Sequence, residues 1–147
     1  MLGSSRFVIG IHVLAILARA QGKGPVCSGF IAQSVNTNPV VIRRLMANME
    51  QALLVRSVAG RKGGFVLAKS PKEITLQEIF SALEGSEIFR MHAREPSREC
   101  PVGSCISHVI SRPLKVAEEA MSAALARTTL NDVVAQIPLP AGGSFRA

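Results

Sequence analysis

Basic side chains are concentrated in one stretch of this 147-residue chain. Residues 43–72 contain seven basic side chains and one acidic one, whereas residues 73–99 contain three basic and six acidic ones. Arg43 and Arg44 lie in the run NPVVIRRL, and Arg61 and Lys62 lie in the glycine-rich run AGRKGG. This local excess, within a net charge of +7, indicates a surface that binds a polyanion. A solvated basic surface, or an adaptor that binds a protein, is the alternative.

Three thiols form the second group of residues suited to chemistry. Cys27, Cys100 and Cys105 are an odd, sparse set, which fits a reducing compartment and not a disulfide scaffold. Because Pro101 follows it, Cys100 is predicted to lie at the start of a helix, where N–H groups and the helix dipole stabilise a thiolate. Cys105 would face elsewhere on that helix. A Cys100–Cys105 disulfide, a bond from Cys100 to Cys27 of either subunit, and inert buried thiols all remain open.

A helix and a hairpin are predicted to position the basic residues. Pro39 suits a first helical position, and an apolar stripe at helical spacing leaves Arg43 and Arg44 on the outer face. Three glycines within residues 59–64 permit a tight turn, so residues 54–58 and 65–68 are predicted to pair. The apolar stripe comprises Ile42, Leu45, Met46, Met49 and Leu53.

Further helices are predicted around this unit. Ser4 or Ser5 can cap a helix that runs to about residue 20, and a shorter helix spans residues 28–35. A three-residue turn then leads into the helix at Pro39, which is helix-turn-helix spacing. The sequence therefore predicts a mainly α fold with a small β-hairpin wing, in which residues 1–85 form a winged helix-turn-helix domain.

The C-terminal part is predicted to join two copies of the chain. Capping-box patterns at Thr75 and Thr129 begin two short helices. Residues 86–100 lack periodicity and are predicted to be a connector or sensor loop, residues 101–137 to be dimerisation helices, and residues 138–147 to be a flexible tail. A heptad-type seam runs along the long helix and is predicted to form the dimer interface, with packing against the first helix as the alternative. The seam comprises Ile110, Leu114, Ala117, Met121 and Ala124.

The compartment and the class of protein also follow from the sequence. The apolar run at residues 7–18 is too short to span a bilayer and is needed as the first helix, so we expect a cytoplasmic protein without a membrane partner. We find no P-loop, H-E-x-x-H or nucleophile-elbow motif, and therefore expect no enzyme.

Over nearly its whole length the chain resembles the bacterial Rrf-two family of winged-helix transcription regulators. The resemblance is carried by SSRFVIGIHVLAILA, IAQSVNTNPVVIRRLMANMEQALLVRSVAGRKGGFVLAK, ITLQEIFSALEG and CPVGSCISHVI. It implies a homodimer, joined through the long helices, that binds double-stranded DNA at a palindromic operator and acts as a repressor. It also implies a sensory chemistry at cysteines near the start of the long helix.

The resemblance assigns roles in DNA binding. The helix that starts at Pro39 would lie in the major groove, with its first residues at the base edges and the preceding turn at phosphates. Relatives place a minor-groove arginine near Ala59, and this role passes here to Arg61 and Lys62. The residues expected to contact DNA are Ser28, Thr37, Asn38, Val40, Val41, Arg43, Arg44, Arg61 and Lys62.

The cysteine loop departs from the members of the family that bind an iron–sulfur cluster. Those members have three cysteines in this region, whereas this chain has Cys100 and Cys105. We therefore expect no cofactor and no metal, and a signal that is oxidation of Cys100, Cys105 or Cys27. A cluster completed by His92, His108 or the other subunit, and a small-molecule pocket behind the DNA-binding domain, are the alternatives.

Overall fold

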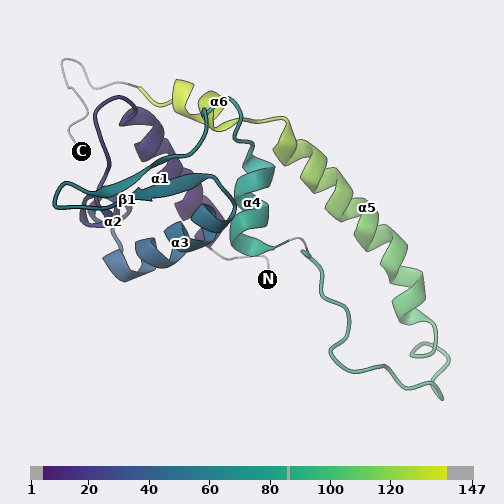
Figure 1. Cartoon of the computed structure of the whole chain (residues 1–147). Coiled ribbons are helices and arrows are strands. Elements are labelled where there is room, and N and C mark those ends of the chain that lie inside the picture. The colour runs from purple at the N-terminus through teal and green to yellow at the C-terminus, as the bar shows by residue number, and fades with distance from the viewer. Residues whose placement is uncertain (1–4, 86, 139–147) are drawn as a thin grey trace.

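The computed structural model describes residues 5–85 and 87–138, and its fold is the predicted one. Helices α1 (Arg6–Arg19), α2 (Ser28–Val35) and α3 (Pro39–Gln51) precede an antiparallel hairpin of β1 (Val55–Val58) and β2 (Gly64–Leu67). Helices α4 (Leu76–Glu84), α5 (Ile106–Ala126) and α6 (Leu130–Ala135) follow. Figure 1 shows α5 extending away from a body that contains the other elements.

The core of the body is aliphatic and joins α1 to α2, α3 and α4. The predicted stripe on α3 is buried at Ile42, Leu45, Met46 and Met49. Leu53 was predicted to continue it, and this was wrong. Leu53 follows the end of α3 in the left-handed region (φ 57°) and is 75% exposed. The largest fully buried side chains are Leu14, Leu17, Ile31, Ile42, Met46, Met49, Leu54, Ile74, Ile79, Leu130, Val13 and Val26.

The hairpin is attached to the connection between α1 and α2. Val55 pairs with Leu67 and Val58 with Gly64, so the strands lie within one residue of the predicted ones. Val26 and Phe65 exchange two backbone hydrogen bonds of 3.0 and 2.9 Å. A Cβ atom on Gly64 would lie 2.3 Å from the Val26 carbonyl oxygen, so only glycine permits this approach.

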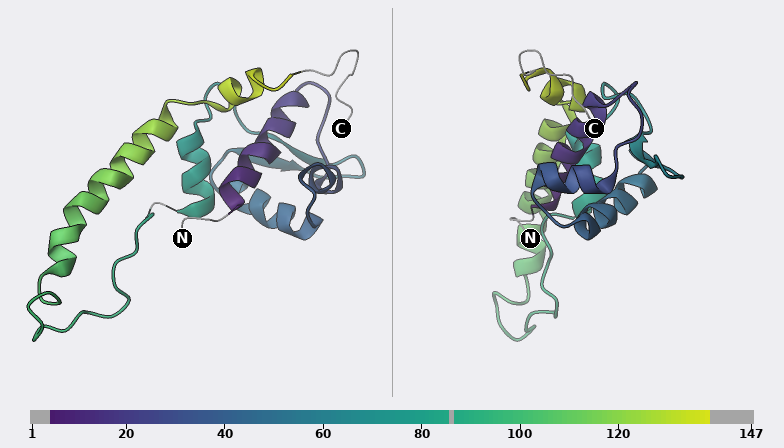
Figure 2. Two further views of the ribbon diagram at one scale, coloured as in Figure 1. Left: turned by 180° about the vertical axis from the view of Figure 1, so that it is seen from behind. Right: turned by 90° about the vertical axis from the view of Figure 1, so that its left-hand side faces the viewer.

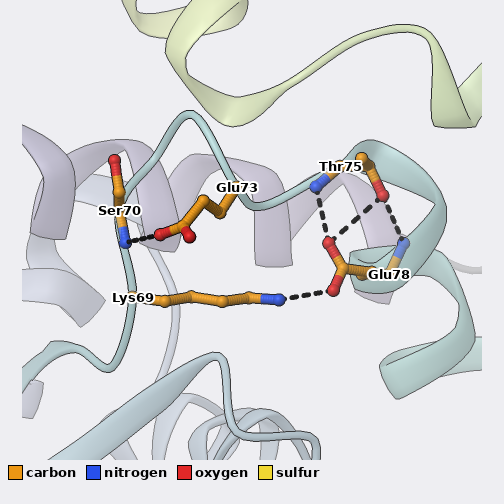
Figure 3. A network of polar contacts seen from close by, with 5 residues as sticks. All are labelled: Lys69, Ser70, Glu73, Thr75 and Glu78. Atoms are coloured by element: carbon orange, nitrogen blue, oxygen red, sulfur yellow. Dashed lines mark hydrogen bonds and ion pairs between the residues drawn. The ribbon is translucent and has the colours of Figure 1, made fainter.

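A polar network fastens the end of the hairpin to α4 (Figure 3). The predicted capping box is present: Thr75 Oγ1 accepts from the Glu78 N–H at 3.2 Å, and the Glu78 carboxylate accepts from the Thr75 N–H at 2.8 Å. The same carboxylate accepts from Lys69 Nζ at 2.5 Å. Because Lys69 follows β2, Glu78 links the base of the hairpin to the first turn of α4.

Glu78 makes the stability of this junction depend on pH. Partial burial opposes ionisation, but hydrogen bonds from Lys69 and Thr75 outweigh it and hold the pKa of the carboxyl below its ordinary value of 4.5. A group whose pKa is lower in the folded chain stabilises the fold above the unfolded pKa and loses that contribution as the pH falls.

We expect Glu78→Gln to reduce the free energy of unfolding by about 0.5–1 kcal/mol at pH 7, a modest value because the pair is partly exposed. The difference from wild type should narrow as the pH falls below about 4.5. Urea unfolding at several pH values measures it, and a difference independent of pH would contradict the assignment.

Helix α5 packs against α4, and backbone hydrogen bonds join the segment that follows α5 to the body. Leu76 N–H donates to the Thr128 carbonyl at 3.0 Å, and Thr75 and Thr129 form an isolated bridge. At Glu118 a carboxylate oxygen accepts from the backbone N–H groups of Ile88 and Phe89, both at 2.9 Å. This carboxylate therefore fixes the start of the connector against α5.

The start of α5 corrects one prediction. The helix was expected from about residue 101 but begins at Ile106, and residues 101–105 form turns. Gly103 packs so closely on the connector that a Cβ atom would lie 2.5 Å from the Ser97 carbonyl oxygen. This contact holds the segment in a turn that folds back on the connector, and a continuous helix would lose it.

The predicted flexible tail lies outside the described residues except for Pro138. Ser4, one of two predicted caps, also lies outside them. Ser5 occupies the N-cap position of α1, but its side chain makes no capping hydrogen bond, so the predicted cap was not found there. Across the described part of the chain, no helix combines the length and the apolar character that a bilayer span requires.

Candidate functional site

The predicted helix-turn-helix is formed by α2, a turn and α3. Asn36 ends α2 in the left-handed region (φ 58°), which its side chain tolerates better than most. The Thr37 N–H donates to the Ala32 carbonyl at 2.9 Å, and Thr37 is half-buried. Asn38 caps α3, because its Oδ1 accepts from the Val40 N–H at 2.8 Å. The turn residues therefore set the direction in which α3 leaves α2.

The first two turns of α3 present the predicted base-reading residues to solvent. Val40 is 52% exposed and Val41 is 41% exposed, although exposed valines at a helix start are costly to hydrate. Arg43 and Arg44 are also exposed, while Ile42, between Val41 and Arg43, is buried in the core. Two arginines and two apolar side chains thus lie together on one helical end.

The tip of the hairpin carries the second basic group. Arg61 and Lys62 are exposed. Gly60 adopts a φ of 110°, and a Cβ atom on Gly63 would lie 2.3 Å from the Val58 carbonyl oxygen, so both glycines are needed for this turn. Figures 1 and 2 show the hairpin tip and α3 on the same side of the body, away from α5. The structure therefore brings the two predicted basic groups onto one side.

Three further side chains belong to the helix-turn-helix and the hairpin. Ser28, the first residue of α2, is half-buried near the surface. Arg56 on β1 is exposed. It was not among the predicted DNA-contacting residues, although the alternating run VRSV indicated an exposed basic side chain at this position. Glu50 accepts from the Ser57 N–H and Oγ at 2.8 Å, which lowers the pKa of Glu50 and ties α3 to β1.

The predicted thiol residues lie in two separate places. Cys27 caps α2, its Sγ accepting from the Phe30 N–H at 3.5 Å. Cys100 lies in the turn before α5, and Cys105 is the N-cap residue of α5. All three thiols are free and exposed, so the alternative that they are buried was wrong. Figures 1 and 2 show α2 and the segment preceding α5 at opposite ends of the molecule.

The pKa of the Cys100 thiol is lowered, as predicted, but the cause differs from the predicted one. Backbone N–H groups of Gly103 and Val102 lower the pKa of Cys100. These N–H groups belong to a turn, not to the first turn of a helix as predicted. Cys105 has the opposite arrangement, because its Sγ lies 3.1 Å from the Pro101 carbonyl oxygen, to which the thiol donates.

The predicted seam lies on a helix with little cover from its own chain. None of the 21 residues of α5 is buried. Ile110, Leu114 and Met121 are half-buried, whereas Ala117 and Ala124 are exposed. Val109 and Val116, which the seam prediction omitted, are 60% and 56% exposed. The apolar surface of α5 is therefore wider than the predicted seam.

Known proteins resemble this chain in sequence and in fold. YwnA of Bacillus subtilis (strain 168), described as an HTH-type transcriptional regulator, is 35% identical over 132 residues, which cover 89% of this chain and 96% of YwnA. The solved structure of CymR, described as the global cysteine regulator of B. subtilis, superposes with a TM-score of 0.70 at 27% identity, covering 94% of this chain and 100% of that one. The oxidized form of Staphylococcus aureus CymR gives 0.66 at 25% identity, covering 95% and 100%.

Residues 3–136 match the family described as "Rrf2: Iron-dependent Transcriptional regulator". Among the residues that the structure describes, no three His, Cys, Asp or Glu side chains are grouped as a metal ion would require. The sequence match and the winged helix-turn-helix with a long C-terminal helix agree with each other. The chain belongs to the Rrf2 family of transcriptional regulators.

Proposed function

We propose that this protein is a cytoplasmic, sequence-specific repressor that binds a palindromic DNA operator as a homodimer and is switched by oxidation of cysteine thiols. In this proposal residues 1–85 bind DNA, residues 86–100 form a connector and sensor, and residues 101–137 dimerise. The observation that carries it is the exposed start of α3, with Val40, Val41, Arg43 and Arg44, on the same side as the basic hairpin tip.

The exposed start of α3 has the chemistry of major-groove readout. An arginine can donate two hydrogen bonds to the O6 and N7 atoms of guanine, and a valine can contact a thymine methyl group. Arg43 and Val40 are the side chains best suited to these roles. Arg61 and Lys62 would reach the sugar–phosphate backbone or the minor groove, while Ser28, Thr37 and Asn38 flank phosphates.

The exposed apolar surface of α5 supports dimerisation. A helix with exposed valines and alanines and no buried residue gains stability when a second copy covers it. A two-fold axis through paired α5 helices would present two α3 helices in opposite directions, which matches a palindromic site.

Exposed, free thiols support switching by oxidation without a bound metal. The similar protein CymR is described as the global cysteine regulator of B. subtilis. We propose neither a resident cofactor nor an enzymatic activity for this chain.

The proposal is tested by fluorescence anisotropy with the DNA upstream of the protein's own gene and a scrambled duplex. Wild type is compared with Cys100→Ser, each reduced and after mild oxidation. We expect tight, specific binding by both reduced proteins and loss of binding on oxidation of wild type alone. Equal affinity for the scrambled duplex would refute sequence-specific regulation, and unchanged binding after oxidation would refute the switch.

The hairpin tip gives a separate prediction. We expect Lys62→Ala to weaken binding to specific and scrambled DNA alike and to reduce the slope of log affinity against log salt by about 1, because one phosphate contact is lost. Titrations at several salt concentrations measure the slope. If Arg61→Ala/Lys62→Ala left the affinity unchanged at every salt concentration, the tip would not contact DNA.

A cavity between α4 and α5 favours a small-molecule effector as a second candidate signal. Its volume is about 480 Å³, and its lining includes Phe80, Lys115 and Gln77. The Gln77 Oε1 atom is buried and has no hydrogen-bond partner among the described residues. A response to metabolites that persists in Cys100→Ser would favour this candidate over the thiol switch.

A further inference from the structure

We infer that two copies of this chain pair their α5 helices antiparallel, along an exposed stripe centred on Val116. In this pair Arg112 of each copy lies beside Glu119 of the partner subunit. The arrangement rests on the proposed homodimer and specifies its contact face, its orientation and its ion pairs. The uncovered face of α5 thus has one occupant, a second copy of the same chain.

Burial identifies the side of α5 that faces its own chain. Ile110, Leu114, Met121 and Leu125 are half-buried, and Met121 lines the cavity between α4 and α5. Glu118 accepts hydrogen bonds from the start of the connector. At about 3.6 residues per turn, all these residues lie on one side of the helix. That side is therefore already used by α4 and the connector, and a second copy must pack elsewhere.

A different side of α5 carries an apolar stripe that is exposed along the whole helix. Val109 and Val116 lie seven residues apart, and both are exposed. Pro113 and Ala120, each four residues further on, and Ala123 fall on the same side and are also exposed. Spacings of four and three residues repeated every seven form the contact line between paired helices. These five residues are the outer stripe.

Charge is present on one flank of the outer stripe only. Arg112 and Glu119 lie on that flank, and the other flank has Ala117 and Ala124; all four are exposed. Glu119 makes a contact of 3.9 Å with Lys115, in which both side chains are largely exposed, so it is weak. Arg112 forms no ion pair within the described part of the chain. Both charges are therefore available to a second copy.

This one-sided charge favours the antiparallel orientation. Antiparallel helices bring like flanks together, whereas parallel helices bring unlike flanks together. Arg112 lies four positions before Val116 and Glu119 three positions after it. A two-fold axis near Val116 therefore places Arg112 at the level of Glu119 of the partner subunit, and symmetry repeats the contact. Parallel pairing would place both charges against the alanine flank and leave them unpaired.

The apolar side chains match in the same register. Val116 is the middle residue of α5 (Ile106–Ala126), so an axis there lets the two helices overlap along their full length. Val109 lies seven positions before Val116 and Ala123 seven positions after it. Each Val109 therefore meets Ala123 of the partner subunit, and a larger side chain packs against a smaller one.

Antiparallel pairing determines where the cysteine turn lies in the dimer. The body is attached after the C-terminal end of α5, and the cysteine turn precedes its N-terminal end. Figure 1 shows these two regions at opposite ends of α5. The cysteine turn of each subunit therefore lies toward the body of its partner. A change at that turn would act on the DNA-binding domain of the other subunit.

The test reverses the two charges in the full chain and measures dimerisation without DNA by analytical ultracentrifugation. Arg112→Glu and Glu119→Arg each convert two attractive contacts into repulsive ones, so each should raise the Kd of the dimer by about tenfold. The double variant Arg112→Glu/Glu119→Arg should return to within about threefold of wild type.

Mixing the two single variants gives a second, independent measurement. Their heterodimer joins opposite charges at both contacts, whereas each homodimer joins like charges. Native mass spectrometry of an equimolar mixture should therefore show the heterodimer as the main dimeric species. Lys72→Glu is the matched control, because it reverses an exposed charge outside α5 and should leave the Kd unchanged.

The contrary results are distinct. A monomeric wild type would overturn the proposed homodimer itself. A dimer that neither single reversal weakens would overturn the outer stripe as its contact face, while the homodimer stands. Single reversals that weaken the dimer, without recovery in the double variant or in the mixture, would overturn the antiparallel register.

Discussion

Arg43→Ala is expected to weaken operator binding by about 1–3 kcal/mol for each half-site and to relax the base preference at the position that Arg43 reads. The reason is that the proposed bidentate pair with guanine would be lost, and a water molecule would not replace both hydrogen bonds in the same geometry. Because a dimer carries two α3 helices, the effect on the whole operator should be roughly twice as large. Affinities for operators substituted at single positions measure both effects.

The control for Arg43 is Arg90→Ala, which removes the same charge from an exposed position in the connector. Arg90→Ala should leave operator affinity nearly unchanged at moderate salt, because long-range screening reduces its effect. If Arg43→Ala weakened operator and scrambled DNA equally, Arg43 would contact a phosphate and the base-reading role would pass to Arg44.

Ala117→Glu has the second large expected effect. Ala117 belongs to the predicted seam and is exposed on α5, between the exposed Val116 and the half-buried face toward the body. A glutamate there would bring two carboxylates together across the proposed two-fold interface, where like charges repel each other. We expect the protein to become monomeric at micromolar concentration. It should also bind the operator about 10²–10⁴-fold more weakly, because binding of one DNA-binding domain no longer raises the local concentration of the other.

Analytical ultracentrifugation measures the state of the Ala117→Glu protein, and anisotropy measures its DNA binding. Ser111→Glu is the matched control, because it adds the same charge at an exposed position on the polar side of α5. If Ser111→Glu separated the subunits as strongly as Ala117→Glu, the interface would lie elsewhere on the helix. A dimeric Ala117→Glu protein would also exclude this face.

Signals confined to a few neighbouring residues predicted the structure well. The capping boxes at Thr75 and Thr129 were both found, because each depends on one side chain and the N–H group three residues away. The sequence also predicted the hairpin within one residue, since its glycines leave few conformations for the turn.

Contacts between distant parts of the chain account for the misses. Pro101 is a good local helix starter, but the contact of Gly103 with Ser97 decided the conformation of the turn instead. The approach of Gly64 to Val26 has no local signal, because the residues are far apart in sequence. Glu118 likewise accepts from N–H groups about thirty residues before it, and no spacing rule identifies such a pair.

The attachment of α5 to the body has a mechanical consequence. The helix is held near its C-terminal end by the contacts of Thr128 and Thr129, while its other end carries the cysteine turn away from the hairpin and α3. Because α5 also packs on α4 and Glu118 is bonded to the connector, the part of α5 that precedes Glu118 is a lever of about 18 Å. A tilt of about 5° about Glu118 would move the far end by roughly 1.5 Å. In a symmetric pair both levers tilt together, so a small local rearrangement at each cysteine turn would alter the span between two DNA half-sites.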